Sequence, residues 1–300
     1  MFKSDEVLGY TYTDTTTNLT WYFTTSGNKA YNLYLYYGTV SGDTLTIPSK
    51  VTYNGVEYEV AGIRGYSTST STSSSYRQNI LYNSTRSISN NKITTVVIPE
   101  TVTSIGNNTF CNFYGLKNIV IPNSVQSVGS YAFYQCSAVE SLSLGTGVQS
   151  IGTYAFNNCR QISGNVIIPN STISVGKYAF QGCSSINQLT LGTGITQIGN
   201  YAFQNCSGIK GKINIPNSTT YLGTYAFYGC SQIEEVTTGT GITTINDRTF
   251  MNCNKLAKIT MQNVSSIGAY AFSNTGIEGD YTIPNTVKTI GNNAFSNCLN

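Results

Sequence analysis

Cysteine is the residue type in this chain with the widest chemical capacity, because a thiolate can be a nucleophile, a metal ligand or half of a disulfide. Seven of the eight cysteines recur at intervals of 23, 24 or 45 residues: Cys136, Cys159, Cys183, Cys206, Cys230, Cys253 and Cys298. Zinc sites need close pairs such as C-x₂-C, which this spacing lacks, so we expect no metal and no cofactor.

The same position holds Phe113 and Thr275 in two other repeats, and a position that accepts Cys, Phe or Thr is typical of core packing. Equivalent residues of stacked rungs lie about 4.8 Å apart, which is more than the Cβ–Cβ distance of about 3.8 Å in a disulfide. We therefore predict buried thiols, with disulfides or metal binding as the alternative.

Cys111 is the exception to this pattern, because it lies only one residue past the recurring Phe. Other repeats carry polar or large residues there, namely Tyr134, Asn157, Gln181 and Ser296. We expect Cys111 to be exposed and make it the candidate for a reactive thiol.

Apart from cysteine, the chain has few residues that could serve in catalysis. The chain has no histidine, which removes the commonest general base and metal ligand. Only Glu235 and Asp280 are expected on the same face, with Lys258 between them, whereas glycoside cleavage needs clustered carboxylates. The composition predicts no enzyme and no catalytic residues.

The charge and hydropathy patterns argue against a nucleic-acid-binding protein and against a membrane-inserted one. Charged residues make up 10% of the chain, against about 25% in typical domains, and the 16 basic residues are scattered, so no nucleic-acid partner is expected. No stretch approaches about 20 apolar residues, so no membrane insertion is expected. Residues 1–20 lack the apolar run of a secretory signal peptide.

The candidate residues discussed so far all belong to a sequence repeat, which must determine where they lie in the fold. Its marker is a Phe that recurs every 22–24 residues, at Phe110, Phe133, Phe156, Phe180, Phe203, Phe227, Phe250, Phe272 and Phe295. This period lies in the range of leucine-rich repeats, and a second period of 47 residues indicates duplication of pairs. The pattern predicts a β-rich repeat solenoid with a parallel sheet on one face and little α-helix.

Each repeat is expected to form one rung. A short strand alternates inward and outward side chains and ends at a corner made by Pro or Gly, and a second extended piece then buries pairs such as Val125 and Val128. Because a rung cannot bury its apolar face alone, neighbouring rungs must stack.

The outward strand positions form the face on which we place a partner. In its first half they are neutral or apolar: Val97, Asn118, Val120, Ser141, Ser143, Asn165 and Ile167. Neutral groups are easier to desolvate than the charges of the second half, Lys212, Glu235, Lys258 and Asp280. The alternative is a solvated face whose charges pair along the stack.

Tyrosines form the alternative binding strip. They precede the Ala-Phe pair at Tyr131, Tyr154, Tyr178, Tyr201, Tyr225 and Tyr270, and Asn108, Arg248 and Asn293 take the same position elsewhere. We expect an exposed row that either stacks on itself or binds a glycan or protein, since Tyr is common at binding hot spots.

The repeat resembles the BspA-like family of leucine-rich repeats, found on the surfaces of gut and oral bacteria and of some protists. The shared motif is Ile-Pro-x-(Ser/Thr)-Val-x-x-Ile-Gly-x-x-Ala-Phe-x-x-Cys, as in IPNSVQSVGSYAFYQC over residues 121–136. The resemblance implies a right-handed solenoid, an extracellular or cell-surface location, and a role in adhesion or host-protein binding. It brings no catalytic residues.

The chain divides into three predicted parts. Residues 1–43 do not repeat and are expected to form an N-terminal β cap, or else a separate binding domain. Residues 44–92 form a degenerate first repeat with a hairpin at Asn54-Gly55 and a Ser/Thr-rich surface loop over 66–79, where the marker would fall at Thr68. Residues 93–300 form nine repeats, the last incomplete, which suggests a monomeric fragment of a longer chain.

Two functions remain open from the sequence. The first is a non-enzymatic adhesion or binding module for a protein or glycan. The second is a structural spacer or fibre segment of a larger surface protein.

Overall fold

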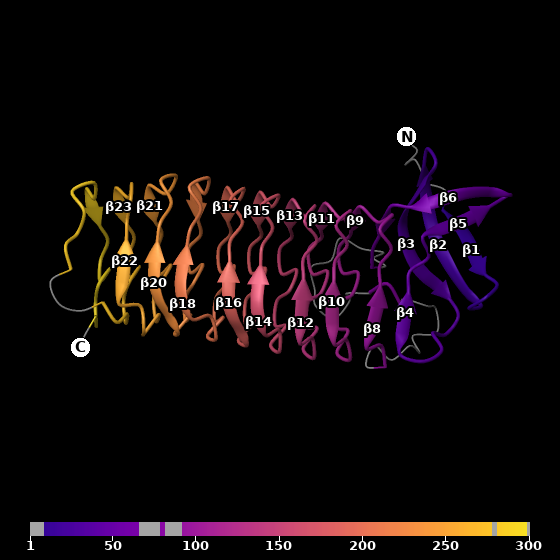
Figure 1. Ribbon diagram of the computed structural model, residues 1–300, viewed down its shortest axis with the longest axis horizontal. Helices are drawn as coiled ribbons and strands as arrows, with labels where there is room; N and C mark the ends of the chain where they lie inside the picture. Colours follow the sequence, from indigo (N-terminus) through magenta and orange to yellow (C-terminus); the bar gives the residue numbers. More distant parts are fainter. Residues whose placement is uncertain (1–8, 66–78, 82–91, 278–280, 299–300) are drawn as a thin grey trace, which may run out of the picture.

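The computed structural model describes residues 9–65, 79–81, 92–277 and 281–298, all of them built from strands and turns. The chain forms an elongated solenoid with the N-terminal residues at one end and the last rung at the other (Figure 1). No helix occurs in these ranges, and hence none that could cross a membrane.

The N-terminal end is an antiparallel unit in which β1 (Tyr10–Asp14) pairs with β2 (Leu19–Ser26) and β2 with β3 (Lys29–Tyr37). A hairpin of β5 (Lys50–Tyr53) and β6 (Val56–Val60) joins it at β3. Asn54 and Gly55 both have positive φ, 49° and 75°, as the two-residue turn predicted from their sequence requires. Trp21, Phe23 and Leu33 fill the unit's core.

The first ladder consists of the strands predicted from the outward and inward alternation. They are β4 (Thr44–Thr46), β8 (Thr95–Val97), β10 (Asn118–Val120), β12 (Ser141–Ser143), β14 (Gly164–Ile167), β16 (Ile186–Thr190), β18 (Gly211–Asn214), β20 (Ile233–Thr237) and β22 (Lys258–Thr260). Hydrogen bonding along this ladder is interrupted: the parallel groups are β4-β8, β10-β12, β14-β16 and β18-β20-β22.

The second ladder consists of two-residue strands on another side of each rung, and the sequence showed it only as a second extended piece. They are β7 (Gly62–Ile63), β9 (Ser104–Ile105), β11 (Ser127–Val128), β13 (Ser150–Ile151), β15 (Ser174–Val175), β17 (Gln197–Ile198), β19 (Tyr221–Leu222), β21 (Thr244–Ile245), β23 (Ser266–Ile267) and β24 (Thr289–Ile290). From β7 to β19 the pairing is continuous, and it joins the N-terminal unit where Leu33 of β3 pairs with Ile63. This unit thereby covers the first rung.

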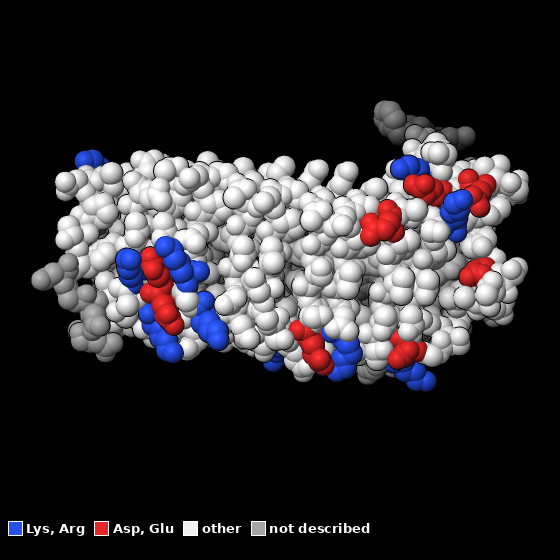
Figure 2. All heavy atoms as spheres, viewed as in Figure 1, with Lys and Arg blue, Asp and Glu red and all other residues white. Residues whose placement is uncertain are grey.

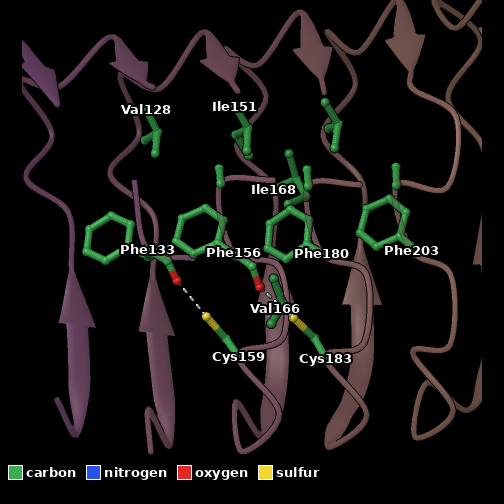
Figure 3. Close-up of a cluster of buried hydrophobic side chains, with 14 of the residues drawn as sticks. Val128, Phe133, Ile151, Phe156, Cys159, Val166, Ile168, Phe180, Cys183 and Phe203 are labelled. Atoms are coloured by element: carbon green, nitrogen blue, oxygen red, sulfur yellow. Dashed lines mark hydrogen bonds between the residues drawn. The ribbon is translucent and has the colours of Figure 1, made fainter. Parts of the chain in front are cut away.

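The core is a column of marker phenylalanines, eight of them fully buried and Phe295 partly buried. Successive rings stack with centroids 5.0 to 5.6 Å apart (Figure 3). Ile80 occupies the marker position of the degenerate first rung. Its amide donates to the Thr109 carbonyl, just as the Phe110 amide donates to that of Ala132. The predicted marker position Thr68 and most of the Ser/Thr loop over 66–79 lie outside the described residues.

Candidate functional site

The outward residues of the first ladder form a flat face with a strong contrast between its halves. Val97, Val120 and Ile167 are 46%, 63% and 56% exposed, so all three apolar side chains predicted at the surface are there. Val120 pairs with Ser143 across β10 and β12. The polar residues of this half are exposed as well, and none of the seven named residues is charged.

The polar residues of this half bond to one another along the stack. Ser141 donates to Asn118 at 2.7 Å, and Thr190 donates to Asn165 at 3.3 Å. These contacts hold the amides in line without exhausting their donors, since an Asn side chain has two N–H groups. The first half is therefore apolar at three points and neutral between them.

The second half of the face carries the predicted charges, and they pair with each other. Glu235 of β20 lies 3.1 Å from Lys212 of β18 and 3.4 Å from Lys258 of β22. The hydrogen bond from Lys212 holds the pKa of Glu235 below its ordinary value. Figure 2 shows the charges gathered over β18, β20 and β22. Asp280, expected next to them, lies outside the described residues.

The tyrosine row is a stacked and half-buried ladder. From Tyr131 to Tyr225 successive ring centroids are 4.5 to 4.8 Å apart. Where Arg248 replaces Tyr, its guanidinium lies 5.5 Å from the ring of Tyr225 and 4.8 Å from that of Tyr270, so a cation fills the gap in the stack. The expected stacking is observed, but the row is half-buried and not exposed as expected, because the rings cover one another.

Backbone geometry sets this row apart. All six tyrosines have φ between 56° and 60°, in the left-handed region that bulky residues rarely adopt. Each such residue costs on the order of 1–2 kcal/mol. Two interactions offset this strain. Ring stacking contributes about 0.5–1.5 kcal/mol per pair. The backbone N–H of each Tyr also donates a hydrogen bond to a carbonyl of the next rung, at 2.9 to 3.1 Å. The row's conformation is thus explained by its structural role.

Six of the seven ladder cysteines are buried and Cys298 is partly buried, and no cysteine of the eight forms a disulfide. Each of the seven ladder thiols donates to the carbonyl of the marker Phe in the preceding rung, at 3.0 to 3.2 Å (Figure 3). Burial raises the pKa of Cys206 and of Cys230 well above the ordinary value. In seven rungs the position thus holds a small apolar side chain that also carries a weak donor, whereas Phe113 fills it by packing alone.

The expected exposure of Cys111 is wrong, because this residue is fully buried. Residues 79–81 lie against its rung: the Asn79 side-chain amide donates to the Cys111 carbonyl at 3.0 Å, and Leu81 stands one residue past Ile80 as Cys111 does past Phe110. The degenerate first repeat therefore covers the thiol that was assigned to solvent.

An open groove on the second ladder was missed from the sequence. Its volume is about 490 Å³, and uncharged side chains line it: Tyr31, Thr103, Ser104, Gln126, Ser127, Gln149, Ser150, Ile173 and Ser174. Four of them, at the first position of β9, β11, β13 and β15, are serines. The recurrence of Ser one residue before the inward Ile or Val was the available signal.

Comparison with known proteins places the repeat in a family. The model for the BspA type leucine rich repeat region matches residues 84–210 and 173–300, with six copies of the repeat. No curated protein matches the chain.

Two solved structures share the fold. A leucine rich cell surface protein from Faecalibacterium prausnitzii is 24% identical, with 96% of this chain and 80% of that chain covered and a TM-score of 0.62. The pneumococcal vaccine antigen PcpA is 17% identical, with 97% and 86% covered and a TM-score of 0.53. At these identities the likeness concerns the fold alone.

Proposed function

The chain belongs to the BspA-type leucine-rich-repeat family, and from that premise we propose that it is a non-enzymatic binding module displayed at a cell surface. Its partner is a protein or a glycan that lies on the first half of the first-ladder face. The printed name of the Faecalibacterium relative, a cell surface protein, supports the location.

One observation carries this proposal: three large apolar side chains are exposed on one flat face whose outward strand residues in this half carry no charge. Val97, Val120 and Ile167 gain nothing from water, and covering them contributes roughly 25 cal/mol per Å² of apolar area. Their neighbours are hydroxyls and amides, which exchange water for a partner without desolvating a charge. Apolar surface with a polar and neutral rim is the composition of protein-binding patches.

A second candidate, a structural spacer, is favoured by the other half of the same face. There Lys212 and Lys258 both pair with Glu235 within the chain, and the outward residues of β16 to β22 include no apolar side chain. A surface whose charges are already paired is suited to separating domains.

The experiment that decides between them is a binding panel with matched variants. Wild-type protein is tested against immobilised mucin, fibronectin, fibrinogen and collagen and against a glycan array. The test variant carries Val97→Lys, Val120→Lys and Ile167→Lys. The control carries Asn214→Lys, Thr237→Lys and Thr260→Lys, which adds the same charge at the same strand position in the second half.

We expect the test variant to lose binding and the control to keep it. Both should melt within a few degrees of the wild type, because exposed substitutions usually change stability by about 0.5 kcal/mol or less. If binding survives in the test variant but is lost when Tyr154, Tyr178 and Tyr201 are changed to Ser, the partner lies on the tyrosine row. Absence of wild-type binding across the panel favours the spacer.

A further inference from the structure

The serines of the second-ladder groove form a row of uncommitted hydroxyls. Ser104, Ser127, Ser150 and Ser174 are successive partners in the ladder, so their hydroxyls recur about every 4.8 Å. None of the four makes a side-chain hydrogen bond to another part of the chain that the structure describes.

Other hydroxyls of the solenoid behave differently. At the corners, Ser124, Ser171 and Ser218 each donate to a carbonyl of the preceding rung, at 2.7 or 2.8 Å. Farther along the serine row itself, Thr289 donates to Ser266 at 2.8 Å. The four groove hydroxyls differ from these in having no such partner, and they lie side by side.

The wall and the end of the groove add amides and an aromatic ring. Gln126 and Gln149 are exposed one residue before the serines, and Ile173, 52% exposed, follows in the next rung. In the first rung the serine position is Gly62, where a Cβ would lie 2.9 Å from Cδ1 of Tyr31. The ring of Tyr31 thus stands where the row would continue and closes the groove at the N-terminal unit.

The lining restricts the class of ligand. None of the nine side chains carries a charge, so the groove offers nothing to complement a polyanion. Strands β9, β11, β13 and β15 are hydrogen-bonded on both sides, so no backbone edge is open to an added peptide strand. What remains is a repeated, neutral array of donors and acceptors with an aromatic face at one end.

We propose that this groove binds a linear, uncharged oligosaccharide along the stacking axis. Sugar hydroxyls match the serine hydroxyls and glutamine amides in charge and in hydrogen-bonding capacity, and the rung spacing is close to the length of one pyranose unit of an extended chain. A terminal sugar ring stacks on Tyr31. This inference shares with the proposed function only the premise that the chain is a binding module. The surface it concerns is the second-ladder groove and not the first-ladder face.

The test uses cellohexaose and chitohexaose as neutral probes and hexagalacturonic acid as the charged one, with affinity measured by titration calorimetry. The groove variant carries Ser127→Ala and Ser150→Ala, which removes two hydroxyls without adding bulk. The matched control carries Thr244→Ala and Ser266→Ala, at the same first position of two successive strands, β21 and β23, outside the groove. Both variants keep every described backbone hydrogen bond.

We expect at least one neutral hexasaccharide to bind, with affinity falling about fivefold per hydroxyl removed and at least tenfold in the groove variant. The control and the triple lysine variant of the first-ladder face should bind as the wild type does. The inference is overturned if neither neutral probe binds, if the groove variant binds as tightly as the wild type, or if hexagalacturonic acid binds equally well. A loss of sugar binding in the triple lysine variant would place the sugar on the first-ladder face and also overturn it. If the triple variant keeps all panel binding, the proposed function fails while the groove result stands.

Discussion

Removing one marker ring from the middle of the stack should cost more than removing one from its end. Phe203 is fully buried, with ring centroids of Phe180 and Phe227 at 5.3 and 5.2 Å on its two sides. Phe295 is partly buried and has one stacked neighbour, Phe272 at 5.2 Å, with Tyr281 tilted against it at 6.3 Å. Nearest-neighbour coupling in a solenoid makes these two positions unequal.

The expected magnitudes follow from burial. Truncation of a fully buried Phe costs about 3–5 kcal/mol, because the transfer term is lost and a cavity is left between two rungs. Phe295→Ala leaves a gap on one side only and exposes less new surface, so about half of that loss is expected. The difference of about 2 kcal/mol corresponds to a melting temperature about 4–8 °C lower for Phe203→Ala than for Phe295→Ala.

Thermal and urea unfolding followed by circular dichroism measure both variants under the same conditions. Gln188→Ala, on the exposed side of β16, is the control and should leave the melting curve in place. Equal melting shifts for Phe203→Ala and Phe295→Ala, or a larger shift for Phe295→Ala, would refute the nearest-neighbour explanation.

Two further predictions concern titratable side chains. Unfolded, unreduced protein should yield eight thiols. In the native state a bulky thiol reagent should react first at the partly buried Cys298 and slowly at Cys206 and Cys230, because burial raises the pKa of these two thiols. Fast reaction at Cys111, mapped by mass spectrometry, would contradict the packing of residues 79–81. Burial, with the stacked Tyr178 next, raises the pKa of Tyr154 from 10.0 to about 12, so the stability that comes from keeping this phenol neutral is present below pH 10 and lost as the pH rises to about 12. Tyr154→Phe should shrink the alkaline loss of stability, and an unchanged pH profile of the melting temperature would count against the assignment.

The repeat period was enough to predict which residues face the core. A 23-residue spacing of Phe, with Cys three residues later, identifies two stacked columns, and both are buried as expected. The alternation within each strand likewise placed Val120 and Ile167 outward. The outward placement follows from side-chain direction in extended backbone, whereas the Phe and Cys columns lie outside the strands and follow from the recurrence of one apolar position in every rung.

The left-handed backbone at the tyrosine row could not be deduced from Tyr itself, but the residues at the same repeat position in other rungs indicated it. Asn108 and Asn293 occupy the same position, and Asn is enriched at positive φ. A second left-handed position, two residues past the marker, is filled by Asn112, Asn158 and Gly182 in different rungs. Columns that mix Asn or Gly with larger residues should be examined for positive φ.

The burial of Cys111 and the groove depend on how distant segments meet, and single-repeat patterns omit that information. Cys111 is covered by residues that follow an insertion, so position within the repeat was misleading there. The groove requires four equivalent serines, an adjacent amide column and a Tyr from the N-terminal unit. Only the stacking of β3 onto the first rung brings that ring to the row.

The 47-residue period has a physical origin in the corners that end the first-ladder strands. A Cβ on Gly145 would lie 2.1 Å from the Pro122 carbonyl oxygen, and the Thr146 amide donates to the Asn123 side chain at 2.9 Å. A Pro-Asn corner therefore fits only beneath a corner that begins with Gly, and the same contacts recur between Pro169 and Gly192 and between Pro216 and Gly239.

This pairing of corners coincides with the breaks in the first ladder. Strands β10 and β12, which end in a Pro corner and a Gly corner, are hydrogen-bonded to each other, and so are β14 and β16, whereas β12 and β14 are not. The isoleucine before each Pro donates to the strand of the Gly rung, at 2.9 Å for both Ile121 and Ile168, which ties the two rungs of one unit together. From β10 to β16 the first ladder thus consists of two-rung plates, with Val120 on one and Ile167 on the next, whereas β18, β20 and β22 form one group of three. A ligand that spans Val120 and Ile167 therefore crosses the seam between β12 and β14, which are not hydrogen-bonded to each other.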